Sequence, residues 1–182
     1  YLGVDLKLCR FPSDFQDISG IILPGVGSFP SGINNLQQND LIGKLKDTVN
    51  GGVPVLGICL GMQLLAQLSE EFGITKGLGF IDGVVTPLGD KNNSLRIPHV
   101  GWNEVVFNNC SIAKDIGDKD DFYFVHSYAY SNPKREYVKG LCSYGKEVVS
   151  IVEKDHIFGT QFHPEKSQKS GLMMLRNFVD LC

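Results

Sequence analysis

The sequence predicts an α/β fold with a mostly parallel central sheet, helices on both faces and a small antiparallel extension. In the first third of the chain, apolar runs typical of strands alternate with segments of helical periodicity. In the middle, short strand-like runs follow one another closely, with glycine and proline between them. No internal repeat and no interdomain linker interrupts the 182 residues. We therefore expect residues 1–182 to form a single domain with a full core.

Strands and helices alternate in the amino-terminal third. Asp40 fits the N-cap of a helix that Gly51 and Gly52 would end. The apolar run at residues 18–23 ends at the glycine loop Pro24-Gly-Val-Gly27. Open α/β sheets build their sites beyond the carboxyl ends of such strands. We expect strands at residues 4–9, 18–23 and 53–58 and helices at residues 40–49 and 62–68.

The rest of the chain is rich in short strand-like runs joined by short turns, which favours antiparallel pairing. A polar loop is expected at residues 88–94, and Ser167 can cap a final helix whose apolar residues share one face. The runs span residues 77–87, 97–107, 121–126, 137–143, 148–153 and 157–162, and the helix face consists of Leu172, Leu175, Phe178 and Val179.

Composition excludes several classes of function. The net charge of −3 provides no basic face, which argues against nucleic acid as a partner. No apolar run approaches the ~20 residues of a membrane span. The five cysteines are odd in number and lack a C-x-x-C pair, which argues against a disulfide framework and a zinc site. We therefore expect a cytoplasmic protein that needs no metal and no cofactor.

A cysteine between two glycines is the first candidate for chemistry. In Gly57-Ile-Cys-Leu-Gly61 a predicted strand passes into a predicted helix. The serine version of this pattern is the nucleophile elbow, whose tight turn needs glycine where neighbouring backbone comes close. The same turn places the sulfur of Cys59 at a helix N-terminus, where the macrodipole favours thiolate. The alternative interpretation is a small buried cysteine in a core strand.

His163 is the favoured general base among the four histidines. It ends the apolar run at residues 157–162, and Glu165 follows where a carboxylate can orient the imidazole. An ordinary strand-ending turn with a solvated acid is the competing interpretation. His126 also ends an apolar run and is either a wall of the substrate site or a core histidine. His99 is expected in a turn with a structural or interfacial role, and His156 is expected in a surface turn.

Backbone N–H groups at the elbow and in a nearby glycine loop are the usual donors to an oxyanion. The residue after the candidate nucleophile is Leu60, and Pro24-Gly-Val-Gly27 is the best candidate for the second donor loop. A phosphate-binding loop is the competing interpretation of this segment. It ranks lower because neither G-x-x-x-x-G-K-[ST] nor G-x-G-x-x-G is present.

Together these segments resemble the class I (triad) glutamine amidotransferases, in which a G-x-C-x-G elbow and a carboxyl-terminal His-x-Glu hydrolyse glutamine. The likeness spans nearly the whole chain and is similar in detail to the glutaminase subunits of imidazole glycerol phosphate synthase. It implies the flavodoxin-like fold of that family. The matching segments are Pro24-Gly-Val-Gly27, Gly57-Ile-Cys-Leu-Gly-Met-Gln63, Pro98-His-Val-Gly-Trp-Asn103, Tyr123-Phe-Val-His-Ser-Tyr128 and Gly159-Thr-Gln-Phe-His-Pro-Glu-Lys-Ser167.

The resemblance implies a role for each matching position. Cys59 would attack the side-chain amide of glutamine, His163 would protonate the departing ammonia, and Glu165 would orient His163. The implied oxyanion donors are the backbone N–H groups of Val26 and Leu60. Glu71 makes independent physical sense, because the α-ammonium of glutamine needs a carboxylate. The plainer interpretation of Glu71 is a solvated charge at a helix end beside Glu70. The positions implied to hold glutamine are Gly25, Gly27, Gln63, Glu71, Ser127 and Tyr128.

The resemblance also implies a partner, a cyclase subunit built as a (β/α)₈ barrel that receives the ammonia in a heterodimer. A tryptophan near the mouth of a site is a common interface anchor. The positions implied to face the cyclase are Trp102, Asn103, Tyr123 and Lys166. The family normally begins with a strand ending in Asp-Tyr-Gly-x-Gly-Asn, which this chain lacks. We therefore expect that an amino-terminal strand of about twenty residues is missing.

Three other functions remain open at this stage. A paralogue with the same chemistry could supply ammonia to another synthase, for instance in amino-sugar or surface-polysaccharide synthesis. A catalytically idle subunit could serve only as a binding module, although the intact Cys59, His163 and Glu165 speak against it. The third is a cysteine peptidase. The carboxylate of Glu71 argues against it, because a site that binds a free α-amine would exclude an internal peptide.

Overall fold

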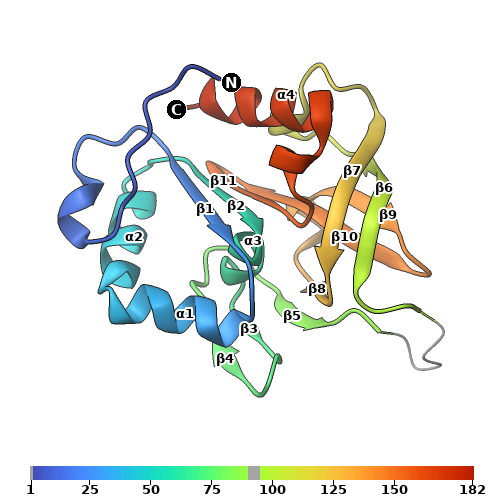
Figure 1. Cartoon of the computed structure of the whole chain (residues 1–182), viewed down its shortest axis with the longest axis horizontal. Helices are drawn as coiled ribbons and strands as arrows, with labels where there is room; N and C mark the ends of the chain where they lie inside the picture. The colour runs from blue at the N-terminus through green and yellow to red at the C-terminus, as the bar shows by residue number, and fades with distance from the viewer. Residues whose placement is uncertain (1, 90–94) are drawn as a thin grey trace.

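A computed structural model describes residues 2–89 and 95–182 (Figure 1). The chain forms a seven-stranded sheet and a smaller four-stranded one, with helices on both sides of the larger sheet. The expected α/β class is confirmed, and so is the small second sheet. In order across the large sheet, the strands are β1 (Ile21–Gly25), β2 (Val55–Cys59), β11 (Ile157–Thr160), β10 (Glu147–Lys154), β9 (Val138–Ser143), β6 (His99–Phe107) and β7 (Lys119–His126).

The large sheet has a parallel part and an antiparallel part. Strands β1, β2 and β11 run parallel to one another, whereas each pairing from β11 through β10, β9 and β6 to β7 is antiparallel. The antiparallel share is therefore larger than the sequence indicated. The small sheet contains, in order, β4 (Thr75–Lys76), β3 (Leu68–Ser69), β5 (Val84–Pro87) and β8 (Tyr128–Ser131).

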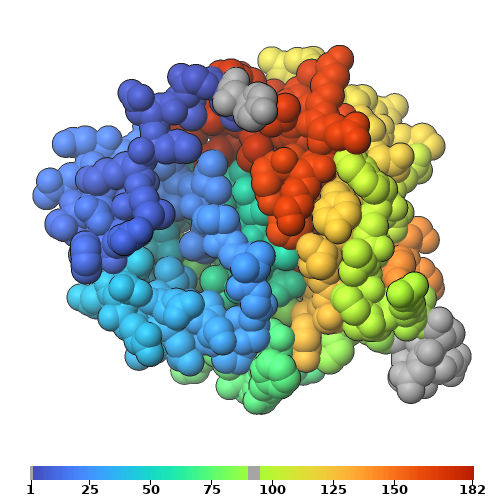
Figure 2. All heavy atoms as spheres, in the orientation of Figure 1, coloured from blue at the N-terminus to red at the C-terminus, as the bar shows by residue number. Residues whose placement is uncertain are grey.

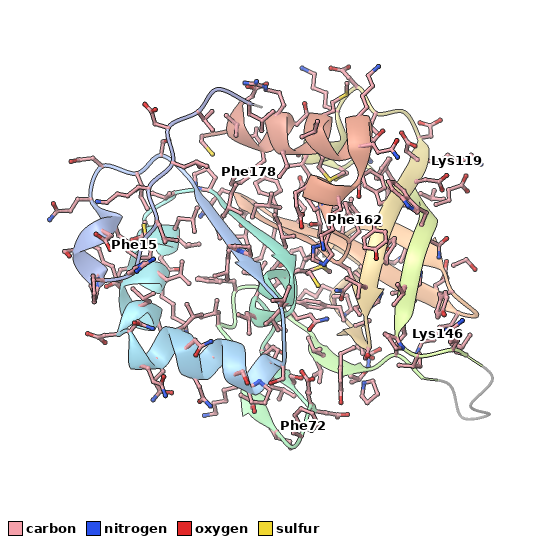
Figure 3. The ribbon with its side chains drawn as sticks, viewed as in Figure 1. Phe15, Phe72, Lys119, Lys146, Phe162 and Phe178 are labelled. Carbon is pink, nitrogen blue, oxygen red and sulfur yellow. The ribbon has the colours of Figure 1, made fainter. Side chains whose placement is uncertain are left out.

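The helices lie where the strands leave apolar faces to cover. Alternate residues of β2 and β11 enter different clusters: Val55 and Ile157 pack toward α1 and α2, while Leu56 and Phe158 pack toward α4. Phe178, labelled in Figure 3, is almost fully buried in the second cluster, a burial worth about 2–3 kcal/mol. The α-helices are α1 (Phe29–Gln38), α2 (Leu41–Asn50), α3 (Leu60–Leu64) and α4 (Gln168–Val179), and the short 3₁₀ helices are η1 (Pro12–Phe15), η2 (Ser111–Ala113), η3 (Arg135–Tyr137) and η4 (Pro164–Lys166).

Several local expectations were wrong. The strand expected at residues 4–9 has no regular structure, because its apolar side chains Leu6 and Leu8 face solvent and no strand of the described residues pairs with it. The helix expected at residues 62–68 is the shorter α3, which starts directly after the elbow and gives way to β3. Helix α1 was not expected; its start is marked by Ser28, whose side chain accepts from the N–H of Ser31.

Two expected caps occupy the right positions without capping. Asp40 precedes α2, and Gly51 follows it as expected, but Asp40 is in the left-handed region and its side chain makes no cap hydrogen bond. Ser167 precedes α4, and its hydroxyl is likewise engaged elsewhere. The expected polar loop at residues 88–94 lies mostly outside the described residues. No helix in the described part of the chain has the length and apolar character needed to cross a bilayer.

Candidate active site

Three parallel strands bring the candidate reactive groups to one edge of the large sheet. Gly25, the last residue of β1, is the register partner of Cys59, the last residue of β2. The next residues, Val26 and Leu60, therefore leave the sheet side by side. Strand β11 pairs with the other side of β2 and leads into His163. This is the carboxyl edge where parallel sheets build their sites.

The elbow at Cys59 depends on close backbone contacts. Cys59 has φ 55° and ψ −110°, a conformation that is costly for a residue with a side chain. A Cβ at Gly57 would lie 2.6 Å from the carbonyl oxygen of Gly61, and one at Gly61 would overlap the carbonyl of Leu23. The two glycines are therefore required by sterics, as the pattern predicted. Cys59 is both the buried last residue of β2 and the residue at which the chain turns into α3, so the elbow geometry is present at the end of a core strand.

The thiol of Cys59 is enclosed and lies beside β7. Its side chain is 7% exposed, and Sγ is 3.8 Å from the carbonyl oxygen of Val125. Burial raises the pKa of the Cys59 thiol to about 11, although the backbone N–H of Leu60 favours the thiolate. The contribution of the helix N-terminus thus has the expected direction. Helix α3 has only five residues, and desolvation outweighs its contribution.

His163 and Glu165 form the pair that the sequence predicted. Nδ1 of His163 is 2.7 Å from Oε1 of Glu165, and the carboxylate remains 46% exposed while the imidazole is 4% exposed. Because a carboxylate only accepts, Nδ1 carries the proton in this contact. Nε2 of His163 is buried and has no hydrogen-bond partner within the described residues. The ring is therefore oriented by the acid, and its second nitrogen is free for chemistry.

The segment around His163 is held against β7 by hydrogen bonds. The N–H of His163 donates to the carbonyl of Tyr123 over 2.9 Å. The hydroxyl of Ser167 donates to the carbonyl of His163 and accepts from the N–H of Tyr123. These contacts explain why Ser167 does not cap α4. They also fix the position of the imidazole relative to the antiparallel part of the sheet.

A cavity of about 300 Å³ contains both Cys59 and His163 on its wall. Of the residues implied to hold glutamine or its oxyanion, only Gly25 is absent from the wall; it lies in β1 against the side chain of Leu60. Gly27 has φ 102°, which favours glycine at that position. The cavity is lined by Val26, Gly27, Cys59, Leu60, Gln63, Glu71, Pro98, Val125, His126, Ser127, Tyr128 and His163.

The acidic residue of the cavity is buried rather than solvated. Glu71 is 8% exposed and follows β3, not a helix, so its interpretation as a helix-end charge was wrong. Its Oε2 accepts from the N–H of Phe29, the first residue of α1, over 2.7 Å. The neighbouring Glu70 is exposed. The cavity thus contains one carboxylate that is held in place and can meet a cation.

Gln63, on the cavity wall, belongs to an amide pair that the sequence only half revealed, because its partner Gln161 lies outside the lining of the cavity. Nε2 of Gln63 donates to the carbonyl of Tyr128 over 2.9 Å and to Oε1 of Gln161 over 3.0 Å. Gln161 was not predicted; its only signal was a polar residue next to Phe162 in an otherwise apolar run. Pro98 and Val125 were also missed, because nothing local to them indicates that they meet the elbow.

The four histidines differ in environment. His126 lines the cavity and is also buried and hydrogen-bonded, so both of its expected roles apply. His99 is a buried residue of β6, stacked on Phe124. His156 lies in the turn between β10 and β11, and its Nε2 is 2.7 Å from the carbonyl oxygen of Val49.

Three of the four residues implied to face a partner lie together. Trp102 is 49% exposed, and its ring meets that of Tyr123 edge to face at 6.1 Å. Nζ of Lys166 lies 5.9 Å from the centre of the Tyr123 ring. Asn103, the next residue along β6, points to the opposite face of the strand and donates to the carbonyl of Ser143. Figure 2 shows β6 and β7 presented to the viewer beside the carboxyl-terminal segment.

Comparison with known proteins identifies the family. The class-I glutamine amidotransferase model matches residues 1–182. The chain is 46% identical over 182 residues to imidazole glycerol phosphate synthase subunit HisH 1 of Campylobacter jejuni, a match covering 99% of this chain and 90% of that protein. It is 41% identical over 181 residues to subunit HisH of Streptococcus mutans, covering 100% and 89%.

Solved structures support the fold. A crystal structure of a glutamine amidotransferase superposes with a TM-score of 0.76 at 18% identity, covering 99% of this chain and 87% of that one. A glutamine amidotransferase from Thermotoga maritima gives a TM-score of 0.61 at 18% identity, covering 91% and 64%. The chain therefore belongs to the class-I glutamine amidotransferases and groups, at 41–46% identity, with the HisH subunits of that family.

Proposed function

We propose that this chain is the glutaminase subunit of an imidazole glycerol phosphate synthase, with Cys59, His163 and Glu165 as its catalytic triad. The observation that carries the proposal is the imidazole of His163. Its Nδ1 is held by Glu165, its buried Nε2 has no partner among the described residues, and His163 lines the same cavity as Cys59. A nucleophile needs a base whose ring is held in one orientation and whose second nitrogen has a lone pair that can take the proton.

The first step forms a tetrahedral adduct, which becomes a thioester when ammonia leaves. Sγ of Cys59 bonds to the side-chain amide carbon of glutamine, and its proton passes to Nε2 of His163. The amide oxygen becomes an oxyanion, for which the N–H groups of Val26 and Leu60 are the proposed donors. Their support is the register pairing of Gly25 with Cys59, which places the two following residues together. Loss of one such donor typically costs on the order of 3 kcal/mol.

The second step releases the products. His163 gives its proton to the leaving nitrogen, the C–N bond breaks, and ammonia departs. Water then attacks the γ-glutamyl thioester, His163 takes the proton of the water, and the C–S bond breaks to return the thiol and glutamate. Because the pKa of Cys59 is raised to about 11, the thiol is protonated at neutral pH, and its proton must pass to His163 before or during the attack.

The cavity wall supports recognition of the whole glutamine molecule. Glu71 is the proposed partner of the substrate's α-ammonium, because its buried carboxylate is anchored at the start of α1. The backbone around Ser127 and Tyr128 and the amide of Gln63 form the facing wall. Glycine at position 25 leaves room for the side chain of Leu60, and glycine at position 27 permits a φ of 102°; Val26 between them is 82% exposed.

The proposed partner is a cyclase barrel that receives the ammonia in a heterodimer in the cytoplasm. The proposed docking surface contains Trp102, Tyr123 and Lys166, which form one cluster on β6, β7 and η4 in which Trp102 and Lys166 are exposed and Tyr123 is half-buried. Val125 follows on the same face of β7 and also lines the cavity. A partner on this surface would lie beside the site where ammonia leaves.

The test separates glutamine use from synthesis. In the complex with the cyclase, Cys59→Ala is expected to abolish glutamine-dependent synthesis and to leave ammonia-dependent synthesis intact. Cys142→Ala, which removes a buried sulfur of β9 away from the cavity, is the matched control and is expected to keep both activities. Equal loss of both activities in Cys59→Ala would contradict the proposed division of labour.

A second experiment addresses the other open functions. Copurification of a cyclase for the histidine intermediate supports the proposal, whereas a sugar-aminating partner would assign the chain to another synthase. A glutamine-like electrophile is expected to label Cys59 in the presence of the partner. Absence of labelling would favour an idle subunit, and turnover of an internal peptide would contradict the role given to Glu71.

A further inference from the structure

Two buried histidines outside the catalytic triad are joined by a hydrogen bond. Nδ1 of His99, on β6, lies 3.1 Å from Nε2 of His126, the last residue of β7. His126 lines the glutamine cavity, whereas His99 does not. Both rings are nearly inaccessible to solvent. A buried pair of this kind is stable only if every nitrogen has a suitable partner.

The hydrogen bond nearest the cavity fixes the tautomer of His126. Its Nδ1 is 2.8 Å from the carbonyl oxygen of Tyr128, which can only accept, so Nδ1 carries the proton. Burial lowers the pKa of His126 to about 4, and the ring is neutral. Nε2 of His126 is therefore an acceptor, and Nδ1 of His99 must donate to it.

The hydrogen bonds of Asn103, on the far side of His99, lead to the same assignment of the protons. Nδ2 of Asn103 donates to the carbonyl of Ser143 over 2.9 Å, which fixes the orientation of the amide. The remaining N–H of that nitrogen faces Nε2 of His99 at 3.4 Å, so this ring nitrogen accepts. Burial lowers the pKa of His99 as well, which agrees with a neutral ring. Two backbone carbonyls thus define the direction of every bond between them.

The chain of bonds ends on a carbonyl that the glutamine site uses. The carbonyl of Tyr128 accepts from His126 and also from Nε2 of Gln63, in the helix that follows the elbow. We infer that Asn103 and His99 are positioning residues, which act through His126 to hold the Tyr128 carbonyl and, with it, Gln63 in the geometry that binds glutamine.

This inference gives Asn103 a role different from partner contact. Its side chain lies on the face of β6 opposite to Trp102, among the residues that enclose His99. The competing explanation is that His99 is only a packing residue, because its ring stacks on Phe124 at 4.7 Å and on Tyr144 at 3.9 Å. Packing alone makes no demand on which nitrogen of either histidine carries the proton, so the two explanations can be separated.

The first test is independent of any activity. Long-range ¹H–¹⁵N correlation spectra of the full chain report which nitrogen of each imidazole is protonated. The inference predicts that His99 and His126 are both neutral with the proton on Nδ1 at neutral pH. In Asn103→Asp the carboxylate offers Nε2 of His99 an acceptor instead of a donor, and His99 is expected to become protonated on Nε2 as well as on Nδ1. Finding either ring with its proton on Nε2 in the unmodified chain would overturn the inference.

The second test rests on the proposed function and uses the complex with the cyclase. His99→Phe keeps a flat ring between Phe124 and Tyr144 but removes both nitrogens. We expect its KM for glutamine to rise about tenfold with little change in kcat, because loss of buried hydrogen bonds acts on the wall rather than on the nucleophile. Ammonia-dependent synthesis is expected to be unchanged.

Matched variants identify the cause of the change. Asn103→Asp is expected to raise the KM for glutamine about as much, whereas Asn108→Asp, the same charge change at an exposed position just after β6, is expected to have no effect. A wild-type KM in His99→Phe would overturn the inference. If the unmodified complex does not use glutamine at all, the proposed function fails, and the protonation of His99 and His126 still decides the hydrogen-bond chain.

Discussion

In the parallel part of the large sheet, three neighbouring strands end at one edge and present Cys59, His163 and the loop at Val26. In the antiparallel part, β7 covers that edge with Val125 and His126, and Tyr128, where the chain enters the small sheet, continues the wall. The parallel part fixes its groups by backbone geometry and register. The antiparallel part fixes its groups by hydrogen bonds between distant side chains. Reactivity and enclosure thus come from regions built on different principles.

The largest expected effect concerns the enclosure of the thiol. If burial raises the pKa of Cys59 to about 11, the thiolate fraction in the free chain grows about tenfold per pH unit. Alkylation of Cys59 by iodoacetamide is therefore expected to accelerate about a thousandfold between about pH 7 and pH 10.

The rate is read from the Cys59 peptide by mass spectrometry, with glutathione as a solvent-exposed reference. A rate for Cys59 that levels off near the ordinary thiol pKa would mean that the antiparallel part does not desolvate the nucleophile. The antiparallel part would then enclose the thiol without changing its pKa.

The second effect concerns the backbone geometry of the parallel part. In Gly61→Ala the new Cβ would overlap the carbonyl of Leu23, so β1 and the elbow must separate. We expect the glutamine kcat/KM to fall at least about a hundredfold and the free energy of unfolding to fall by about 3 kcal/mol. Kinetics of the complex and urea denaturation of the chain measure the two changes.

The control for this substitution is Gly43→Ala in α2, where nothing lies within 4 Å of the new Cβ. It is expected to preserve activity and to stabilise the chain by about 0.5–1 kcal/mol, because alanine favours a helix over glycine. Wild-type activity in Gly61→Ala would show that the elbow tolerates a shift that the sterics forbid.

The smallest of the three effects concerns a side-chain contact over long sequence separation. Glu71→Gln keeps an oxygen for the N–H of Phe29 but removes the charge offered to the α-ammonium of glutamine. We expect the KM for glutamine to rise about thirtyfold with a smaller change in kcat, as for loss of a hydrogen bond to a charged group. Steady-state kinetics of the complex test this.

Glu70→Gln is the matched control, because Glu70 is the exposed neighbour of Glu71 and lies outside the cavity wall. It is expected to leave the KM for glutamine unchanged. Equal effects of the two substitutions would mean that Glu71 acts through general electrostatics and not as a buried ligand.

The two regions also differ in how far they could be predicted from the sequence. The elbow was predictable because Gly57, Cys59 and Gly61 express one local backbone requirement. His163 and Glu165 were predictable because the orienting contact spans two residues. In each case the physical cause lies within a few residues of the side chain that does the chemistry.

The rest of the site depends on contacts that no local pattern encodes. Gln161 meets Gln63 across 98 positions of the chain, and Val125 meets Cys59 across 66. Asn103 was placed beside Trp102 as a partner contact, a role that stays a prediction, while the alternation of β6 directs the two side chains to opposite faces. The raised pKa of Cys59 could not be predicted for the same reason, because the segments that bury the thiol are remote in sequence.

The pairing of Gly25 with Cys59 has a consequence for redesign of this protein. Side chains alternate along a strand, so adding a single residue within β2 would rotate the sulfur to the reverse side of the sheet. Changes of length in the turn at residues 51–54, at the other end of that strand, leave the alignment untouched. Engineered insertions therefore belong at the amino end of each parallel strand, where the chain can lengthen without displacing the nucleophile.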